Sequence, residues 1–92
     1  MTTIDLDCRQ TAAGWTCSVQ LGEPDAPPSL HEVTVSRADL ERLAPGATDP
    51  SELVRRSFEF LLQREAPASI LRTFDLPLIG RYFPEYESTI RG

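Results

Sequence analysis

The stretch from Asp49 to Glu65 carries the strongest helix signal in the chain, and it constrains the fold more than any other segment. Asp49 is a suitable N-cap because its carboxylate can accept hydrogen bonds from the free amides of a first helical turn. Pro50 then takes the first helical position, where its missing N–H costs nothing. Glu52 stands three residues after the cap, as in a capping box. A proline just beyond the stretch ends the pattern, which predicts a helix over residues 50–65.

The apolar residues of this predicted helix cover more than half of its circumference, because Phe60 widens a face that already has helical spacing. The other members of that face are Leu53, Val54, Phe58, Leu61 and Leu62. A face this wide requires two partners, so we expect a sheet on one side and the C-terminal segment on the other. Burying each large side chain contributes roughly 1.5–3 kcal/mol, so packing rather than helix propensity decides whether the helix forms.

Two alternating segments near the N-terminus predict a β-hairpin. They cover residues 3–9 and 15–21, and the turn between them ends at Gly14, which can take a positive φ. If the turn is tight, the numbers of opposed residues sum to 25, and this register places every apolar residue on one face. Cys8 then lies directly opposite Cys17.

The two opposed cysteines are close enough in this register for a disulfide bond. The N-terminus, however, lacks the basic and apolar regions of a secretory signal, and cysteines in reducing compartments remain thiols. We therefore expect Cys8 and Cys17 to be reduced, buried, small hydrophobic side chains. Two cysteines and one histidine do not supply four zinc ligands at a familiar spacing, so no metal and no cofactor is predicted.

A third strand is predicted over residues 30–36, after a proline-rich connector at residues 22–29. We expect the connector to be an exposed, irregular loop, because proline cannot donate to a sheet ladder. His31 is the only histidine, and its position at the start of the strand favours a surface or edge location. No serine, cysteine or acid stands at a spacing that would make it a catalytic base.

The predicted fold is a single α+β domain over residues 1–92, in which a three-stranded antiparallel sheet packs on one main helix. The strands are expected at about 3–9, 15–21 and 30–36, the main helix at 50–65, and short helices at 37–43, 68–74 and 76–83, followed by a polar tail over residues 85–92.

Charge and hydropathy exclude some classes of partner. Fourteen acidic against nine basic residues give a net charge of −5. A nucleic-acid-binding surface requires a basic excess, so no nucleic-acid partner is predicted. No apolar stretch approaches the eighteen or so residues of a membrane span. We therefore expect a cytoplasmic protein with no membrane partner.

The C-terminal third is the richest in apolar and aromatic residues, and two interpretations of it stay open. It can fold over the main helix and close the core, or part of it can form a partner surface. Tyrosine, phenylalanine and arginine are common at interaction hot spots, so the candidate partner surface is Arg81, Tyr82, Phe83 and Tyr86. A three-stranded sheet also has two open edges, which predicts a homodimer.

Two sequence words carry a resemblance to known proteins. SILRTFDLPLIGRYFPEY and VTVSRADLERL are similar to segments of a family of small uncharacterised bacterial proteins. That resemblance covers residues 31–87 and implies a bacterial origin, but no activity and no site residues. The order of a hairpin, a third strand and a helix also resembles HicB-type antitoxins, although the Gly-Tyr and Pro-Gly-Cys words of those proteins are absent here. This second resemblance implies a basic toxin as partner.

Three function classes follow from these observations. The first choice is a protein-interaction or regulatory module without catalysis. The second is an antitoxin-like protein, since the negative charge favours a basic partner. The third is a small enzyme with an unrecognised site. Asp5 and Asp7 come nearest to a carboxylate pair, but their spacing on a strand places both on the solvent face. The five glycines are scattered, so no phosphate-binding loop is predicted, and we predict that the chain is not an enzyme.

Overall fold

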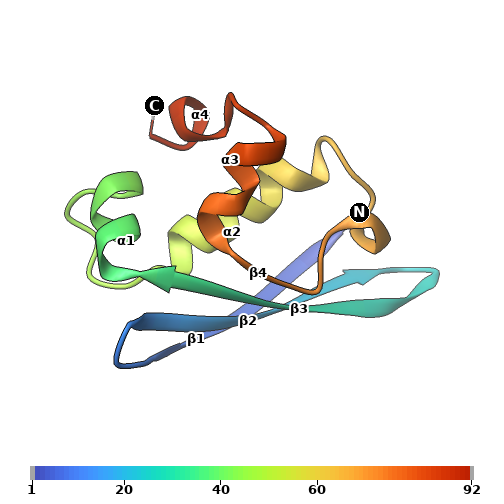
Figure 1. Cartoon of the computed structure of the whole chain (residues 1–92). Helices are drawn as coiled ribbons and strands as arrows, with labels where there is room; N and C mark the ends of the chain where they lie inside the picture. Colours follow the sequence, from blue (N-terminus) through green and yellow to red (C-terminus); the bar gives the residue numbers. More distant parts are fainter. Residues whose placement is uncertain (1, 92) are drawn as a thin grey trace.

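The computed structural model describes residues 2–91 and is an α+β fold, as the sequence predicts. A sheet forms one layer, and the helices form a second layer on one side of it (Figure 1). The sheet is larger than predicted: it has four strands rather than three, and it is mixed rather than purely antiparallel.

The strands lie in the order β1-β2-β3-β4 across the sheet. The first three pair antiparallel with their neighbours, and β4 pairs parallel with β3. Their bounds are β1 Thr3–Gln10, β2 Gly14–Glu23, β3 Ala26–Ser36 and β4 Thr73–Asp75.

The predicted hairpin register is confirmed. Cys8 pairs with Cys17, and the apolar residues on either side of this pair continue along the same face. Gly14 begins β2 with a φ of +153°. A Cβ atom added there would collide with the carbonyl oxygen of Val35 on β3, so the turn requires glycine both for its backbone angle and for this close approach.

The prediction of an irregular connector at residues 22–29 is wrong, because the β2–β3 hairpin continues through most of these residues. Leu21 still pairs with Ser29, and Glu23 pairs with Ala26, with a register shift between the two pairs. The two prolines of β3 fall in this shift. Proline has no N–H to donate, and the regular pattern of ladder hydrogen bonds is interrupted at this shift, so both prolines are tolerated there.

The first two helices begin near their predicted caps. Helix α1 (Arg37–Leu43) starts after Ser36, whose hydroxyl accepts a hydrogen bond from the Asp39 amide at 3.1 Å. Helix α2 spans Ser51–Leu62, so it begins one residue later than predicted and ends three residues earlier. The Asp49 carboxylate still accepts from the Ser51 amide at 2.9 Å, and this hydrogen bond lowers the pKa of the Asp49 carboxyl below its ordinary value.

The C-terminal segment differs most from the prediction. A helix was expected at residues 68–74, but only a 3₁₀ turn, η1 (Pro67–Ser69), forms, and the chain then extends into β4. The reason lies in the partner: β3 offers a free edge, and its Glu32 amide donates to the Arg72 carbonyl at 2.6 Å. A short apolar run does not by itself distinguish a strand from a helix.

The rest of the chain is helical in short pieces. The helix expected at 76–83 is a 3₁₀ turn, η2 (Leu76–Leu78), followed by α3 (Ile79–Tyr82). A polar tail was predicted for residues 85–92. This prediction is wrong for residues 86–91, because they form helix α4 (Tyr86–Arg91). The buried side chains of Tyr86 and Ile90 hold this helix against the core.

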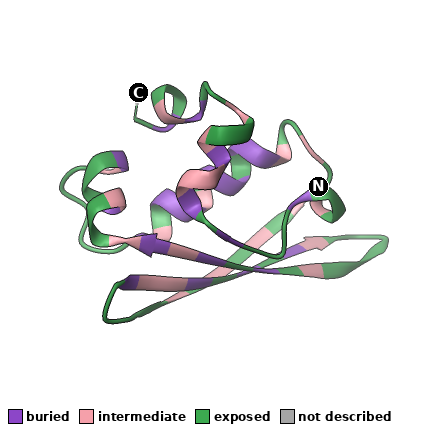
Figure 2. Ribbon diagram, viewed as in Figure 1, coloured by how far each residue is buried: buried purple, intermediate pink, exposed green. Residues whose placement is uncertain are grey.

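The core lies between the sheet and the helical layer, where buried residues follow α2 and the face of the sheet below it (Figure 2). Phe58 of α2 contacts Phe74 of β4, with ring centroids 6.1 Å apart. Arg55 of α2 donates to the Ile4 carbonyl of β1 at 3.0 Å, and Arg56 donates to the Ile90 carbonyl at 2.9 Å. Helix α2 therefore contacts both the sheet and the closing segment, which is the C-terminal part of the chain from η2 to α4 (residues 76–91), and α1, α3 and α4 share the layer with it.

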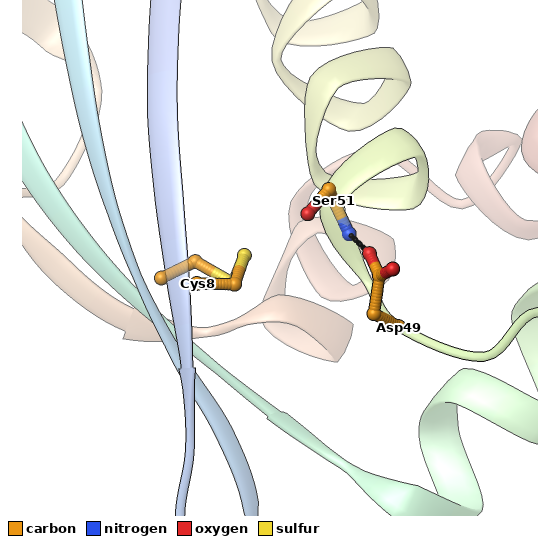
Figure 3. The surroundings of a disulfide bond; sticks show 4 residues. Cys8, Asp49 and Ser51 are labelled. Atoms are coloured by element: carbon orange, nitrogen blue, oxygen red, sulfur yellow. Dashed lines mark hydrogen bonds between the residues drawn. A yellow bond between two sulfur atoms is a disulfide. The ribbon is translucent and has the colours of Figure 1, made fainter.

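Cys8 and Cys17 form a disulfide bond, so the expectation of reduced thiols is wrong. Their Cα atoms lie 4.0 Å apart across the β1–β2 ladder, because the register brings them directly opposite each other. Figure 3 shows Cys8 beside Asp49 and Ser51 at the start of α2. The bond therefore ties the hairpin together near the beginning of this helix.

The surface or edge location expected for His31 is also wrong, because this residue is buried, with 4% of its area exposed. It lies on the inner face of β3, which is an interior strand of the sheet because β4 covers its second edge. Its ring lies 5.6 Å from that of Phe58. Among residues 2–91, no helix is long and apolar enough to cross a membrane.

Candidate functional site

The four residues of the predicted partner surface divide between two environments. Tyr82 on α3 is 67% exposed, and Arg81 beside it is also exposed. Phe83 is half-buried and packs edge-on against Phe60, with ring centroids 5.9 Å apart. Tyr86 has no exposed surface. It therefore belongs to the core and contributes nothing to a partner surface.

The phenol of Tyr86 is held inside the helical layer by Ser57 of α2. The Ser57 hydroxyl donates to the Leu53 carbonyl at 2.7 Å, so the Tyr86 hydroxyl, 2.6 Å away, donates to Ser57. Burial raises the pKa of Tyr86 to about 12, because the phenolate cannot be solvated there. This pair closes the core and does not form a site.

A groove of about 240 Å³ lies where the end of α2, the η1–β4 segment and the η2–α3 segment meet. Its lining is predominantly apolar, with two polar residues, Glu65 and Ser69. The apolar lining residues are Leu61, Ile70, Leu71, Phe74, Leu78, Ile79, Tyr82 and Phe83. Two residues of the predicted partner surface, Tyr82 and Phe83, therefore line a hollow that no sequence pattern indicates.

The walls of the groove expose apolar side chains to solvent. Tyr82 and Leu71 are 67% and 49% exposed. They are two of the three large hydrophobic residues exposed within residues 2–91, and the third is Leu30 on the sheet. Folding leaves this apolar surface open to water, and surface of this kind marks interaction sites when it gathers in one place.

His31 fixes the position of one wall of the groove. Its Nδ1 atom lies 2.7 Å from the Leu71 carbonyl oxygen, and a carbonyl only accepts, so Nδ1 carries a proton. The Ser29 hydroxyl lies 3.0 Å from Nε2. His31 thus connects β3 to the chain just before β4, across 40 residues of sequence.

The rim on the α2 side is ordered by Arg64. Its guanidinium lies over the Phe60 ring, 3.6 Å from the centroid, and donates to the Phe60 carbonyl at 3.1 Å. Arg64 also pairs with Glu85 at 3.3 Å. These contacts hold the turn after α2, in which Glu65 brings a carboxylate to the groove.

A second hollow of about 470 Å³ lies on the sheet and is lined partly by acidic residues. Asp5, Asp7 and Glu32 are among its lining residues, and all three are exposed. In residues 2–91, no three histidine, cysteine, aspartate or glutamate residues are grouped so that they could hold a metal ion. The carboxylates of this hollow face solvent, as the alternation along β1 predicts for Asp5 and Asp7.

We compared the chain with protein-family models, with curated proteins and with solved structures, and nothing matched in any of the three comparisons. The resemblances to small bacterial proteins and to HicB-type antitoxins therefore stay predictions.

Proposed function

We propose that this chain is a protein-interaction module without catalysis, and that it binds its partner by accepting a large apolar side chain into the groove. The observation that carries the proposal is the exposure of Leu71 and Tyr82 on the walls of a hollow that is otherwise apolar. Aromatic side chains that seat in such pockets are the usual anchors of protein–protein interfaces.

The size of the groove supports a side chain as its occupant. A cavity of about 150 Å³ is enough for benzene, and sites for drug-sized ligands usually run from about 300 to 1,000 Å³. At about 240 Å³, the groove accommodates one aromatic ring or branched aliphatic side chain. A nucleotide or a larger cofactor exceeds this volume.

The charge of the chain supports a basic partner. The net charge is −5, and Glu65 places a carboxylate in the groove lining. Opposite charges steer association and suppress incorrect partners. We therefore propose a partner segment in which one aromatic residue is flanked by basic residues. A small basic toxin, as the antitoxin resemblance implies, is one protein of this type.

The test is a two-dimensional NMR titration of the chain with two blocked peptides of equal charge, Arg-Ala-Phe-Ala-Arg and Arg-Ala-Ser-Ala-Arg. We expect the phenylalanine peptide to shift signals at the groove, around Leu71 and Tyr82, and the serine peptide to leave them unchanged. Tyr82→Ala should abolish these shifts. Leu30→Ala is the matched control, since Leu30 is 59% exposed but lies outside the groove.

Two results would contradict the proposal. One is the absence of groove shifts at millimolar phenylalanine peptide. The other is a set of shifts that is the same for both peptides and spread over the acidic sheet surface, which indicates charge attraction alone.

The cytoplasm remains the proposed location, and the disulfide makes this point testable. Disulfides are rare in reducing compartments, so the Cys8–Cys17 bond must be shielded there. Cys17 has no exposed surface, and Cys8 is half-buried. Thiol alkylation in intact bacterial cells should then leave both cysteines unmodified while the chain fractionates with cytoplasmic proteins. Alkylation of both cysteines in those cells would contradict a cytoplasmic disulfide, and recovery of the chain outside the cytoplasm would contradict the proposed location.

A further inference from the structure

We propose that two copies of this chain join through the outer edges of β1, with Cys8 facing Cys8 of the second copy. The joined sheets would be continuous, with β1 of one copy running antiparallel to β1 of the other. This interface is separate from the groove, because it lies on the edge of the sheet opposite β4. The dimer proposal and the groove proposal can therefore be tested independently.

The outer edge of β1 has backbone groups available for this pairing. β1 is the first strand in the sheet order, and within residues 2–91 only β2 pairs with it. The Cys8–Cys17 pair has its Cα atoms 4.0 Å apart, the close spacing of a pair that is not hydrogen-bonded. The N–H and C=O of Cys8, and by alternation those of Leu6 and Gln10, therefore point away from β2.

The hydrogen bond from Arg55 agrees with this alternation. Its guanidinium reaches the Ile4 carbonyl oxygen at 3.0 Å, so that carbonyl points outward from the ladder. Ile4 lies four residues before Cys8, so the alternation along the strand points the backbone groups of both residues in the same direction. Arg55 also blocks this position, because its side chain occupies the acceptor that an added strand would use.

The charges of β1 select one register for a second copy. With the two-fold axis at Cys8, Asp7 lies opposite Arg9 of the second copy, and the pair occurs twice on the solvent face. An axis at Asp7 also forms two Asp5–Arg9 pairs, but it places the Asp7 carboxylate directly against its own copy. An axis at Leu6 places Asp5 against Asp7. Opposite charges on directly facing residues stabilise a sheet, and like charges destabilise it.

The same register avoids Arg55. It pairs residues 6–10 with each other and leaves Ile4 outside the new ladder, so the bond from Arg55 is kept. The other two registers both require Ile4. The segment Asp7-Cys8-Arg9 is thus complementary to itself in charge.

Helix α2 packs over β1, so its direction sets where the two helical layers meet in the dimer. Helix α2 begins beside Cys8 (Figure 3) and reaches Ile4 one turn later through Arg55. It therefore runs along β1 away from the proposed axis. In the dimer, the two α2 helices start near the axis and diverge.

Sedimentation equilibrium of the full chain and four variants tests this interface. We expect the wild-type chain to form a species of twice its 10.3 kDa mass. Asp7→Arg and Arg9→Asp each replace two attractive pairs by two repulsive ones, and each should raise the dimer dissociation constant by about tenfold or more. The double variant Asp7→Arg/Arg9→Asp restores opposite charges and should return the constant to near the wild-type value.

Asp5→Arg is the matched control, because it makes the same change of charge on the same face of β1 but outside the paired segment. It should leave the dissociation constant unchanged. Circular dichroism checks the fold of every variant. If Asp7→Arg does not fold, Arg9→Asp against the wild type carries the test.

Three results would overturn the proposal. A monomer at every concentration up to one millimolar excludes the dimer. A dimer that tolerates both single charge reversals uses another surface. A dimer weakened by Asp5→Arg uses the register with its axis at Asp7, in which Asp5 faces Arg9.

Discussion

Helices α3 and α4 show how differently two neighbouring segments can use the same residue type. Each carries a tyrosine, and the two tyrosines are four residues apart. Tyr82 on α3 is 67% exposed, whereas Tyr86 on α4 is fully buried. A continuous helix would place residues four apart on one face, but the chain is extended at Phe83, which ends α3.

The two tyrosines differ in role, because one stabilises the fold and the other lies on the surface proposed to bind a partner. Tyr86 packs edge-on against Phe60, with ring centroids 5.3 Å apart, and its hydroxyl is satisfied by Ser57. Tyr82 instead lines the groove. A cluster of aromatic residues in a sequence therefore does not define a surface, because a break in the helix can send one ring into the core and leave the next in water.

Replacing the two tyrosines one at a time tests the comparison with the largest expected effect. Tyr86→Ala should lower the free energy of unfolding by about 3–5 kcal/mol, as for other buried aromatic residues. Tyr82→Ala should change it by no more than about 0.5 kcal/mol. Urea unfolding followed by circular dichroism measures both. Equal losses for the two variants would mean that both rings belong to the core.

Removing the disulfide tests whether the hairpin and the closing segment are stabilised independently. The Cys8→Ser/Cys17→Ser variant should lower the free energy of unfolding by about 2–3 kcal/mol, because the bond closes a short loop in the unfolded chain. Removing the disulfide from the Tyr86→Phe variant should lower the free energy of unfolding by the same amount, because the effects of mutations at distant sites are additive. A loss that changes by more than about 1 kcal/mol between the two backgrounds would show that the two regions are coupled.

Replacing His31 tests how far the groove depends on the sheet. His31→Phe keeps an aromatic ring beside Phe58 but removes the donor to the Leu71 carbonyl, so it should lower the free energy of unfolding by about 1 kcal/mol. The phenylalanine peptide should also bind the groove more weakly, because Leu71 loses its anchor. Unchanged peptide affinity in a folded variant would show that the groove wall holds without His31.

The sequence predicted those parts of the fold that depend on local pattern. Alternation and the turn at Gly14 were sufficient for the β1–β2 register, and Ser36 and Asp49 marked the starts of two helices to within one residue. These features are visible locally because each is determined by residues within a single turn, hairpin or helix.

Features that depend on distant partners were missed. β4 has three residues and forms only because β3 offers an edge about 40 positions earlier, and His31 is buried by the same segment. The groove needs this segment as one wall, so the prediction of a helix at residues 68–74 excludes it. The disulfide was allowed by the predicted register, and the expectation that Cys8 and Cys17 are reduced was the part that failed.

The alkaline titration of Tyr86 tests most directly whether α4 closes the core. The chain has no lysine, arginine stays protonated, and disulfide-bonded cysteines do not titrate, so a Tyr82→Phe variant has Tyr86 as its only tyrosinate signal. The pKa of Tyr86 is raised to about 12 in the folded chain, above the value of about 10 for an exposed phenol. The folded state therefore favours the neutral phenol, and stability should be full below pH 10 and fall as the pH rises toward 12.

The measurement is the tyrosinate absorbance of the Tyr82→Phe variant between pH 9 and pH 12.5, recorded together with far-ultraviolet circular dichroism. We expect the absorbance to rise with a midpoint at about pH 12, together with loss of the folded signal. A midpoint near pH 10 with the fold intact would contradict the account, because it would place the ring of Tyr86 in water.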